Sequence, residues 1–433
     1  MTATTRPGAW STVAAIRLPR VEFERGLAIT FVLAVLMPYL SPVPIRGMDV
    51  QPVAMALAPL MIASRWLAGG GRLVRAEWWL AAVGIGSLVY CLPYRFDGIA
   101  DYVRICGPLA IGAAIVIGLG RALRLVSPAI VVVAAAAYLL GVLVQLLLPG
   151  LYDAAVAPFL SEVRYEPGAV RGPNGLAVEP SIVGNICALF IAVPSIYRES
   201  WWRARPRLGW TLRAMAAVTA ALTASITGIL SCLVVAVALY LRTFDARIVW
   251  RLFFIVAGLA LAAFLVVRLE PGGRVGDLVS GLRESPFWVL TELSLVLRYA
   301  GGLFSLSNLP AHPFGDGVGV LTPAIVDHGL AVWAYRLDWN DYYVASIVDF
   351  IELTASGLAS VVIRAGWLGI AAIALVFAIA ARGRYGIVRL LLVLTMLINV
   401  SLATPFMWFV IAIGILTAVD DRRAALAARG APP

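Results

Sequence analysis

The sequence has no lysine and only two histidines, and charged residues make up 13% of its 433 residues. A soluble protein of this length carries about a quarter charged residues, so the composition argues against one. The four cysteines, Cys91, Cys106, Cys187 and Cys232, all fall within apolar stretches and form no CxxC or Cys/His spacing. This pattern disfavours a zinc site or a disulfide framework, and we expect the cysteines to be small buried hydrophobic residues.

Hydrophobic residues make up 61% of the chain, and apolar runs close to the roughly 20 residues that cross a bilayer recur from end to end. We therefore predict an all-α polytopic membrane protein with about twelve transmembrane helices. The N-terminal arginines precede no cleavable signal pattern, so the first apolar run is expected to be retained. The expected spans are 26–41, 50–64, 77–93, 102–119, 127–148, 181–197, 208–224, 226–241, 248–268, 355–381, 387–403 and 405–419.

The distribution of basic residues predicts the orientation. All 34 basic residues are arginines, and most of them fall in segments that lie inside if the N-terminus is cytoplasmic. The expected organisation is a cytoplasmic segment (1–25), spans one to nine (26–268) with an outer loop at 149–180, a large outer loop (269–354), spans ten to twelve (355–419) and a cytoplasmic tail (420–433). The net charge of +10 could indicate a nucleic-acid partner, but the arginines are distributed as they are in a membrane protein. The expected partner is therefore the lipid bilayer and not nucleic acid.

The first polar constellation lies in "AVRGPNGLAVEPSIVGNICALF", from Ala169 to Phe190. Pro180 suits the first turn of a helix, which puts Glu179 at the cap and Ser181 just inside. The positive end of that helix would face the outer boundary of the membrane beside Arg171 and Asn174, where it favours anions. The alternative is that Arg171 only reaches the headgroups and Glu179 only caps the helix, and the sequence leaves both interpretations open.

A second constellation is "LTASITGILSCL", from Leu222 to Leu233, where the chain reverses between two expected spans with almost no loop. Ser225 and Thr227 supply small hydroxyl groups, and Gly228 allows close backbone approach. Small residues at such a turn serve helix packing more often than ligand binding.

The large outer loop carries the third constellation. "ESPFWVLTELSLVLRYAGG" has Ser285 as a cap and Pro286 at the first helical position, and its alternating faces predict an amphipathic helix on the membrane surface with Arg298 on the polar face. The Gly-rich "HPFGDGVG" follows. As a phosphate-binding loop this run is a weak signal, because no strand precedes it.

The candidate acid/base groups also lie in this loop: His312, His328, Asp349 and Glu352, with Arg364 just inside span ten. Histidine is a natural general base near neutral pH, although a loop histidine is more often a surface residue. The many aromatic residues nearby anchor at the interface by default, and stacking on sugar rings is their functional alternative.

These elements in this order resemble the O-antigen polymerase and ligase superfamily of bacterial envelope proteins. The first likeness is "R..NGL..EPS..G", which covers Arg171, Asn174, Gly175, Leu176, Glu179, Pro180, Ser181 and Gly184 and is close to the Glu-Pro-Ser pattern of the polymerases. The second is "LTASITGILS", which is similar to a Thr-x-Ser-Arg-x-Gly turn. The third is an arginine followed by "PFGDGVG" and a Gly-x-x-Gly span opening, Gly366 to Gly369. The likeness covers the chain from about Arg171 to Gly369.

The resemblance implies an inverting, metal-independent glycosyltransferase without a cofactor, in the bacterial inner membrane with both termini cytoplasmic. Donor and acceptor would be oligosaccharides on polyprenyl diphosphate at the periplasmic face, and a chain-length regulator is a possible partner. Arg171, Arg298 and Arg364 would contact the diphosphate. The other substrate-binding candidates are Asn174, Ser181, Ser225 and Thr227, and the catalytic candidates are Glu179, His328, Asp349 and Glu352.

Two departures from the family shape the prediction. Ile226 replaces the arginine of the Thr-x-Ser-Arg turn, and no His-Asn pair precedes the Gly-x-x-Gly span as it does in the ligases. Asp349 and Glu352 lie at that distance instead, with His328 further upstream. The sequence therefore favours a polymerase, with a carboxylate or His328 as the base.

Four alternatives remain. A ligase that transfers glycan to lipid A–core belongs to the same superfamily and differs in its acceptor. Multi-span polyprenyl-phosphate sugar transferases place paired acidic residues in the first outer loop, where this chain has only Asp49. A lipid or glycan transporter would carry charges deep inside its spans and related halves. A non-catalytic scaffold leaves the placement of Arg171 and Glu179 unexplained.

Overall fold

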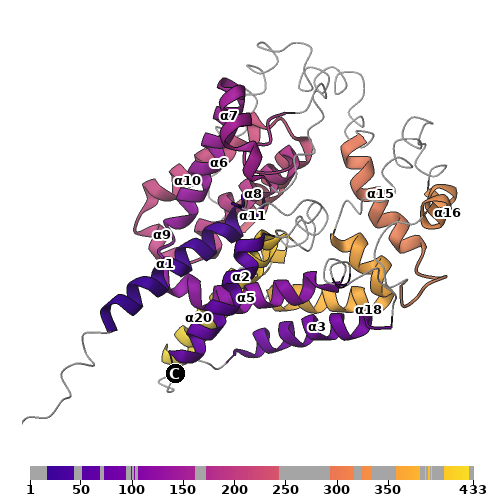
Figure 1. Cartoon of the computed structure of the whole chain (residues 1–433), viewed down its shortest axis with the longest axis horizontal. Coiled ribbons are helices and arrows are strands. Elements are labelled where there is room, and N and C mark those ends of the chain that lie inside the picture. The colour runs from indigo at the N-terminus through magenta and orange to yellow at the C-terminus, as the bar shows by residue number, and fades with distance from the viewer. Residues whose placement is uncertain are drawn as a thin grey trace, which may run out of the picture.

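The computed structural model describes residues 17–42, 51–68, 73–93, 99, 102, 106–160, 172–242, 293–315, 323–333, 357–380, 386, 389–390, 392 and 404–428. These residues form helices joined by short turns, and the single β-bridge among them joins Leu40 to Leu160. Figure 1 shows the helices as one assembly, with α15 and α16 on the side opposite α6, α9 and α10. The expectation of an all-α fold is confirmed for the described part of the chain.

The helices of the first half are α1 (Arg17–Leu36), α2 (Pro52–Leu67), α3 (Arg75–Cys91), α5 (Pro108–Leu125), α6 (Ile130–Leu147), α7 (Pro149–Ala155) and the short 3₁₀ turn η1 (Ala157–Phe159). Those of the second half are α8 (Pro180–Ile196), α9 (Glu199–Arg203), α10 (Pro206–Leu222), α11 (Ile226–Arg242), α15 (Leu293–Ser307), α16 (Pro323–Trp333), α18 (Gly357–Ala380) and α20 (Pro405–Ala428). Proline opens many of them because its fixed φ suits the first turn and its missing N–H would have no partner there.

Ten of the expected spans coincide with a described helix: α1, α2, α3, α5, α6, α8, α10, α11, α18 and α20. The span expected at 248–268 lies outside the described residues, and so does most of 387–403. Among the described helices, α5, α6 and the Gly357–Ile379 part of α18 are long and apolar enough to cross a membrane. The apolar helices α2, α8, Thr227–Tyr240 and Ala324–Trp333 are shorter. The fold is thus compatible with a membrane protein, and the count of twelve spans stays a prediction.

Helix α8 lies at the centre of the fold. From Ser181 to Val193 every residue is buried, and the helix packs against α6, α10, α11 and α20. A Cβ atom added to Gly184 would lie 2.1 Å from the Cα atom of Gly228, so α8 and α11 approach each other closely at this pair of glycines. Close contact through small residues is how helices associate when lipid removes the hydrophobic drive between them.

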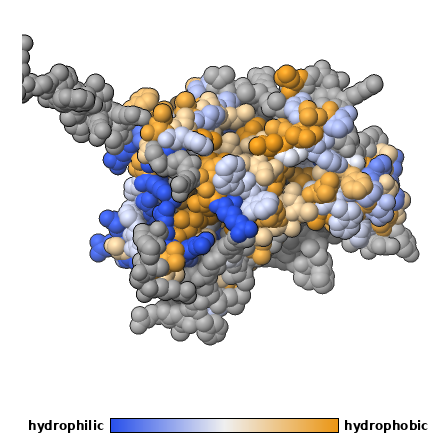
Figure 2. Space-filling model, turned by 90° about the horizontal axis from the view of Figure 1, so that it is seen from below, coloured by the Kyte–Doolittle hydropathy of each residue, from blue (hydrophilic) through white to orange (hydrophobic). Residues whose placement is uncertain are grey.

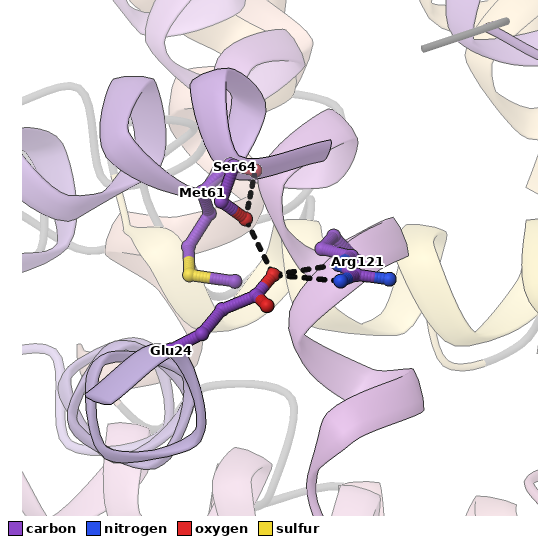
Figure 3. Close-up of polar contacts among 4 residues, drawn as sticks. All are labelled: Glu24, Met61, Ser64 and Arg121. Atoms are coloured by element: carbon purple, nitrogen blue, oxygen red, sulfur yellow. Dashed lines mark hydrogen bonds and ion pairs between the residues drawn. The ribbon is translucent and has the colours of Figure 1, made fainter. Parts of the chain in front are cut away.

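Ionic contacts tie several helix ends together. The Glu24 carboxylate on α1 accepts hydrogen bonds from Ser64 of α2 and from Arg121 of α5, with both bond lengths at 2.8 Å (Figure 3). Arg65 of α2 forms a 2.7 Å ion pair with Glu77 of α3. A Cβ at position 120 would lie 2.7 Å from the Glu77 carboxylate, so Gly120 of α5 leaves room for this buried pair.

Exposed arginines lie on the same side of the molecule. Arg203 ends α9, Arg205 and Arg207 lie at the beginning of α10, and Arg422 and Arg423 lie near the end of α20. We call the region formed by the beginnings of α1, α3 and α10, the ends of α2, α5, α8 and α20, and the short helix α9 the arginine-rich edge. Figure 2 shows strongly hydrophilic residues gathered toward one side, and hydrophobic residues over much of the rest of the visible face. The hydrophilic side in Figure 2 is the side on which α1, α9 and the end of α20 lie in Figure 1.

The helices of the large expected loop pack on one another. Phe304 of α15 fits against Gly329 of α16, where a Cβ would lie 2.3 Å from the phenyl ring, and α15 also contacts α18. The expected amphipathic helix begins at Ser285, which lies outside the described residues; within them, α15 continues to Ser307. Helix α18 differs from the expected continuous span, because Gly366 takes non-helical angles (φ 53°, ψ −131°) and breaks it.

Candidate functional site

A buried polar network holds the segment that precedes α8. The Asn174 side-chain oxygen accepts a 2.6 Å hydrogen bond from the Gln145 amide of α6, and the Asn174 amide donates to the Ala177 carbonyl at 2.7 Å. The Gly175 N–H donates to the Gln145 side-chain oxygen at 2.8 Å. Asn174 is 3% exposed. Since a buried polar group without a partner is costly, this reciprocal bonding fixes the segment to α6.

Tyr152 of α7 closes the network from the other side. Its hydroxyl donates to the Gly175 carbonyl and lies 3.4 Å from the Asn174 side-chain oxygen. Burial, and to a smaller extent the nearby Asp153 carboxylate, raises the pKa of Tyr152 above its ordinary value of 10.0, so the hydroxyl stays a donor in neutral solution. Gly175 has a φ of 52°, which glycine adopts without steric strain.

Glu179 occupies the N-cap position of α8, as the sequence predicts, with Pro180 in the first turn. Its carboxylate accepts a 3.1 Å hydrogen bond from the Ser181 hydroxyl and makes no capping bond to a backbone N–H. Ser181 is 4% exposed, whereas Glu179 is only partly buried. The site therefore combines a reachable carboxylate with the positive end of a buried helix.

The turn between α10 and α11 packs onto this segment. A Cβ at Gly172 would lie 2.0 Å from the Thr223 carbonyl oxygen, so only glycine allows the two chains to approach this closely. Ala224 in the turn has a φ of 50°, which is unusual for a residue with a side chain. The Ser225 hydroxyl accepts a 3.3 Å hydrogen bond from the Gly228 N–H and so caps α11. The structure thus brings the first two sequence constellations together.

Further along the two helices, a polar contact joins α8 to α11. The Ser231 hydroxyl donates to the Asn185 side-chain oxygen at 2.6 Å and also lies 2.8 Å from the Thr227 carbonyl. Thr227 is buried, and Asn185 is fully buried with a side-chain amide nitrogen that has no hydrogen-bond partner. Polar side chains therefore continue from the α8 N-terminus into the helix pair.

The third constellation forms a separate joint. Gly366, at the break of α18, lies so close to the Pro313 carbonyl that a Cβ would come within 2.1 Å of its oxygen, and the Trp367 N–H donates to the same oxygen at 2.9 Å. Gly315 (φ 78°) packs in turn on the backbone of Arg364. The Tyr90 hydroxyl of α3 donates to the Phe314 carbonyl. The "PFG" run and the Gly-x-x-Gly run are thus in direct contact.

The predicted site residues fall into three groups. Arg171, Asp349 and Glu352 lie outside the described residues, and Arg298 lies on α15 with only its backbone described. Asn174, Glu179, Ser181, Ser225 and Thr227 gather around the beginnings of α8 and α11. Arg364 is 8% exposed at the α18 break, and its guanidinium lies 3.5 Å from the Ser360 hydroxyl.

His312 belongs to the Gly315–Gly366 joint through its backbone, because its carbonyl accepts a 2.9 Å hydrogen bond from the Gly315 N–H, whereas His328 belongs to neither cluster. His312 is exposed in the turn after α15, and His328 is exposed on α16. In Figure 1, α16 lies on the other side of the molecule from α7 and α8. The structure therefore does not bring His328 to the Glu179 end of α8.

Gln145 and Tyr152 belong to none of the motifs that the sequence pointed to. Gln145 is the only amide side chain in the apolar run of α6, and a lone amide within an expected span is a signal that could have identified it. Within the described ranges, no three His, Cys, Asp or Glu side chains gather as metal ligands do. The chain matches no protein-family profile, no curated protein sequence and no solved structure.

Proposed function

We propose that this protein is an inverting, metal-independent glycosyltransferase that polymerises oligosaccharide units carried on polyprenyl diphosphate. The reaction would take place at the periplasmic face of the bacterial inner membrane. The sequence motifs described above motivate this proposal, and the packing of those motifs supports it.

The observation that carries the proposal is the contact of Gly172 with the turn at Thr223. It joins two motif segments that are far apart in the sequence, beside the N-terminus of α8 with Glu179 and Ser181. Arg171 directly precedes Gly172 in the sequence. An arginine and a helix N-terminus can stabilise the negative charge that develops on a departing diphosphate, and a carboxylate can accept the acceptor's proton.

The chemistry assigns a role to each group. The acceptor hydroxyl attacks the anomeric carbon from the face opposite the diphosphate, the bond from that carbon to the phosphate oxygen breaks, and a base takes the hydroxyl proton. Negative charge grows on the departing diphosphate, where Arg171 and the positive end of α8 lower its energy. Glu179 is the described candidate for the base, and Asp349 and Glu352 remain candidates from the sequence. His328 is the least suited of the predicted bases, because α16 lies on the other side of the molecule from α8.

The Gly315–Gly366 joint supplies the second part of the proposal. It sets the backbone of Arg364 beside the "PFG" turn, and α15 with Arg298 packs on the same α18. The family resemblance assigns Arg298 and Arg364 to the donor's diphosphate, and this assignment needs the joint and the beginning of α8 to face the same donor. Asn174, Ser181, Ser225 and Thr227 are assigned to the sugar or to holding the backbone that faces it.

The arginine-rich edge supports the orientation. Arginine-rich ends of membrane helices face the cytoplasm, and α8 runs from Glu179 at one end to Arg198 just beyond the other. The beginning of α8 would therefore face the periplasm, where a donor that has been flipped across the membrane is available. We accordingly propose that both termini are cytoplasmic.

The test is reconstitution in liposomes with the host's polyprenyl-diphosphate-linked repeat unit and a chelator. A ladder of longer lipid-linked glycans is expected from the wild-type protein, lost in Arg171→Ala and Glu179→Gln and kept in Arg203→Ala, an exposed control. Transfer only after addition of lipid A–core would identify a ligase. No product with either acceptor would contradict the proposal and favour a transporter.

A further inference from the structure

A cavity of about 170 Å³ opens at the arginine-rich edge, between the ends of α5, α8 and α20. Its charged lining consists of Arg124, Arg198, Arg423 and Asp420, and Tyr197 also lines it. A cavity of this size has room for several water molecules, or for one small anion in their place. It lies at the end of α8 opposite Glu179, about 25 Å away for a helix of 17 residues.

The walls of this cavity are tied to one another. The Leu123 carbonyl at the end of α5 accepts 3.0 Å hydrogen bonds from the Tyr197 hydroxyl and from the Arg198 guanidinium. The Thr417 hydroxyl of α20 donates to the Ile196 carbonyl of α8 at 2.8 Å. Arg198 itself takes a left-handed conformation (φ 45°) that turns the chain from α8 into α9. The three helix ends therefore form a preformed site.

The charges in the cavity are not balanced. Three arginines and one aspartate give a formal charge of +2. Among the described residues, no ion pair joins Arg124, Arg198 or Arg423 to a carboxylate. Arg423 and Asp420 both act electrostatically on Arg124, so the charged groups of α5 and α20 face each other across the space. Like charges that line one small cavity repel one another, and an anion bound between them relieves this repulsion.

The lining also suggests what kind of anion binds. Leu123 and Leu416 supply an apolar wall beside the arginines. Arginine presents a planar set of donors that matches phosphate oxygens. Basic pockets between membrane helices at the cytoplasmic boundary recognise phospholipid headgroups. Arg124 and Arg423 are exposed at the mouth, so a phosphate can reach them from the membrane surface.

We propose that the cavity formed by Arg124, Arg198 and Arg423 is a binding site for a phosphate group, supplied either by the headgroup of an anionic phospholipid or by free phosphate. The bound phosphate neutralises the excess positive charge and clamps the ends of α5, α8 and α20 together. This site is separate from the proposed transfer site and does not depend on it.

The test uses the purified full chain in a neutral detergent with phosphatidylglycerol, phosphatidylcholine or inorganic phosphate. Native mass spectrometry measures bound lipid, and thermal unfolding gives the midpoint temperature. We expect phosphatidylglycerol to bind and raise the midpoint, and phosphatidylcholine not to. The double variant Arg124→Gln/Arg423→Gln should bind about tenfold more weakly or worse, because it loses two charge-assisted contacts. Arg207→Gln, an exposed arginine outside the cavity, should behave as the wild type.

The sample with inorganic phosphate shows whether the bound phosphate comes from a lipid headgroup or from free phosphate. If it raises the midpoint and displaces the lipid, the site takes free phosphate; if only phosphatidylglycerol acts, the site is for lipid. The proposal is overturned if the double variant binds phosphatidylglycerol as tightly as the wild type. It is also overturned if neither phosphatidylglycerol nor inorganic phosphate affects the wild type.

A second variant covers the case in which the double variant does not fold. Asp420→Asn removes the one negative charge and should strengthen binding severalfold, while unchanged or weaker binding overturns the proposal.

Discussion

At the scale of single residues, the candidate site depends on polar groups that are buried and mutually satisfied. Asn174, Gln145 and Tyr152 come from three different parts of the chain and bond one another around Gly175. In a largely apolar interior such groups lose water without compensation if a partner is removed. The segment before Glu179 is therefore fixed by these bonds as well as by the burial of Leu176, Ala177 and Val178 in the apolar core.

Tyr152→Phe tests this network. It removes the donor to the Gly175 carbonyl, and we expect a loss of about 1–3 kcal/mol in the free energy of unfolding together with a strong loss of glycan polymerisation. Tyr138→Phe is the matched control, because it removes a buried hydroxyl that donates to the Leu36 carbonyl of α1 and takes no part in the Asn174 network. Thermal unfolding and the glycan ladder are the two measurements. Equal losses of activity in both variants would contradict a specific role for Tyr152.

At the scale of elements, glycines decide how close the helices come. Gly172 contacts the α10–α11 turn, Gly184 contacts Gly228 between α8 and α11, and Gly366 breaks α18. Each allows a backbone approach that a Cβ would block. The motifs therefore contribute to the packing of the elements, whatever chemistry their polar residues perform.

Gly366→Ala should disrupt the joint between α18 and the "PFG" turn. Alanine at a φ of 53° is strained by about 1–3 kcal/mol, and its Cβ would clash with the Pro313 carbonyl. We expect a lower midpoint of thermal unfolding and a shorter glycan ladder. The control is Gly302→Ala on α15, where no atom lies within 4 Å of the new Cβ and the helix should gain about 0.5–1 kcal/mol. A wild-type ladder from Gly366→Ala would show that the joint is not needed for transfer.

At the scale of the whole molecule, the ionic contacts divide the helix bundle into two unlike ends. Glu24 joins α1, α2 and α5, and the buried pair of Arg65 and Glu77 joins α2 and α3 at the same edge (Figure 3). The proposed transfer site lies at the far end of α8. The bundle is thus anchored by charge at one end and carries its candidate chemistry at the other.

Glu77→Gln should destabilise the whole bundle. The side chains of Arg65 and Glu77 are 10% and 5% exposed, and removing one partner of a buried ion pair costs about 3–5 kcal/mol. Glu199→Gln is the control, since Glu199 pairs with an Arg203 side chain that is 72% exposed and such helical pairs contribute about 0.3–0.5 kcal/mol. The midpoint of thermal unfolding checks both. Similar midpoints for the two variants would mean that the Arg65–Glu77 pair does not hold the bundle.

The proposed orientation predicts which end a membrane-impermeant thiol reagent reaches. In a background where the four native cysteines are replaced, Asp153→Cys on α7 should be labelled in intact spheroplasts. Arg205→Cys, at the arginine-rich edge, should be labelled only after the membrane is opened. Both positions are exposed. The reverse pattern would invert the topology and move the proposed transfer site to the cytoplasm.

The sequence by itself determined the features that depend on local order. Apolar runs predicted helices at most of the described positions, and the Glu-Pro-Ser run predicted the start of α8 with Glu179 at its cap, because capping and proline effects act within a few residues. The sequence also predicted which helix ends carry arginines, since the positions of charged residues are known directly from the sequence.

The tertiary structure alone decided which of these segments meet. It joined Gly172 to Thr223, Gly315 to Arg364 and Gln145 to Asn174, and it placed Arg124, Arg198 and Arg423 around one cavity. It also separated the helix that carries His328 from α8. Contacts between residues that are distant in sequence follow from how whole helices pack, and packing depends on the fit of many side chains at once rather than on any local pattern.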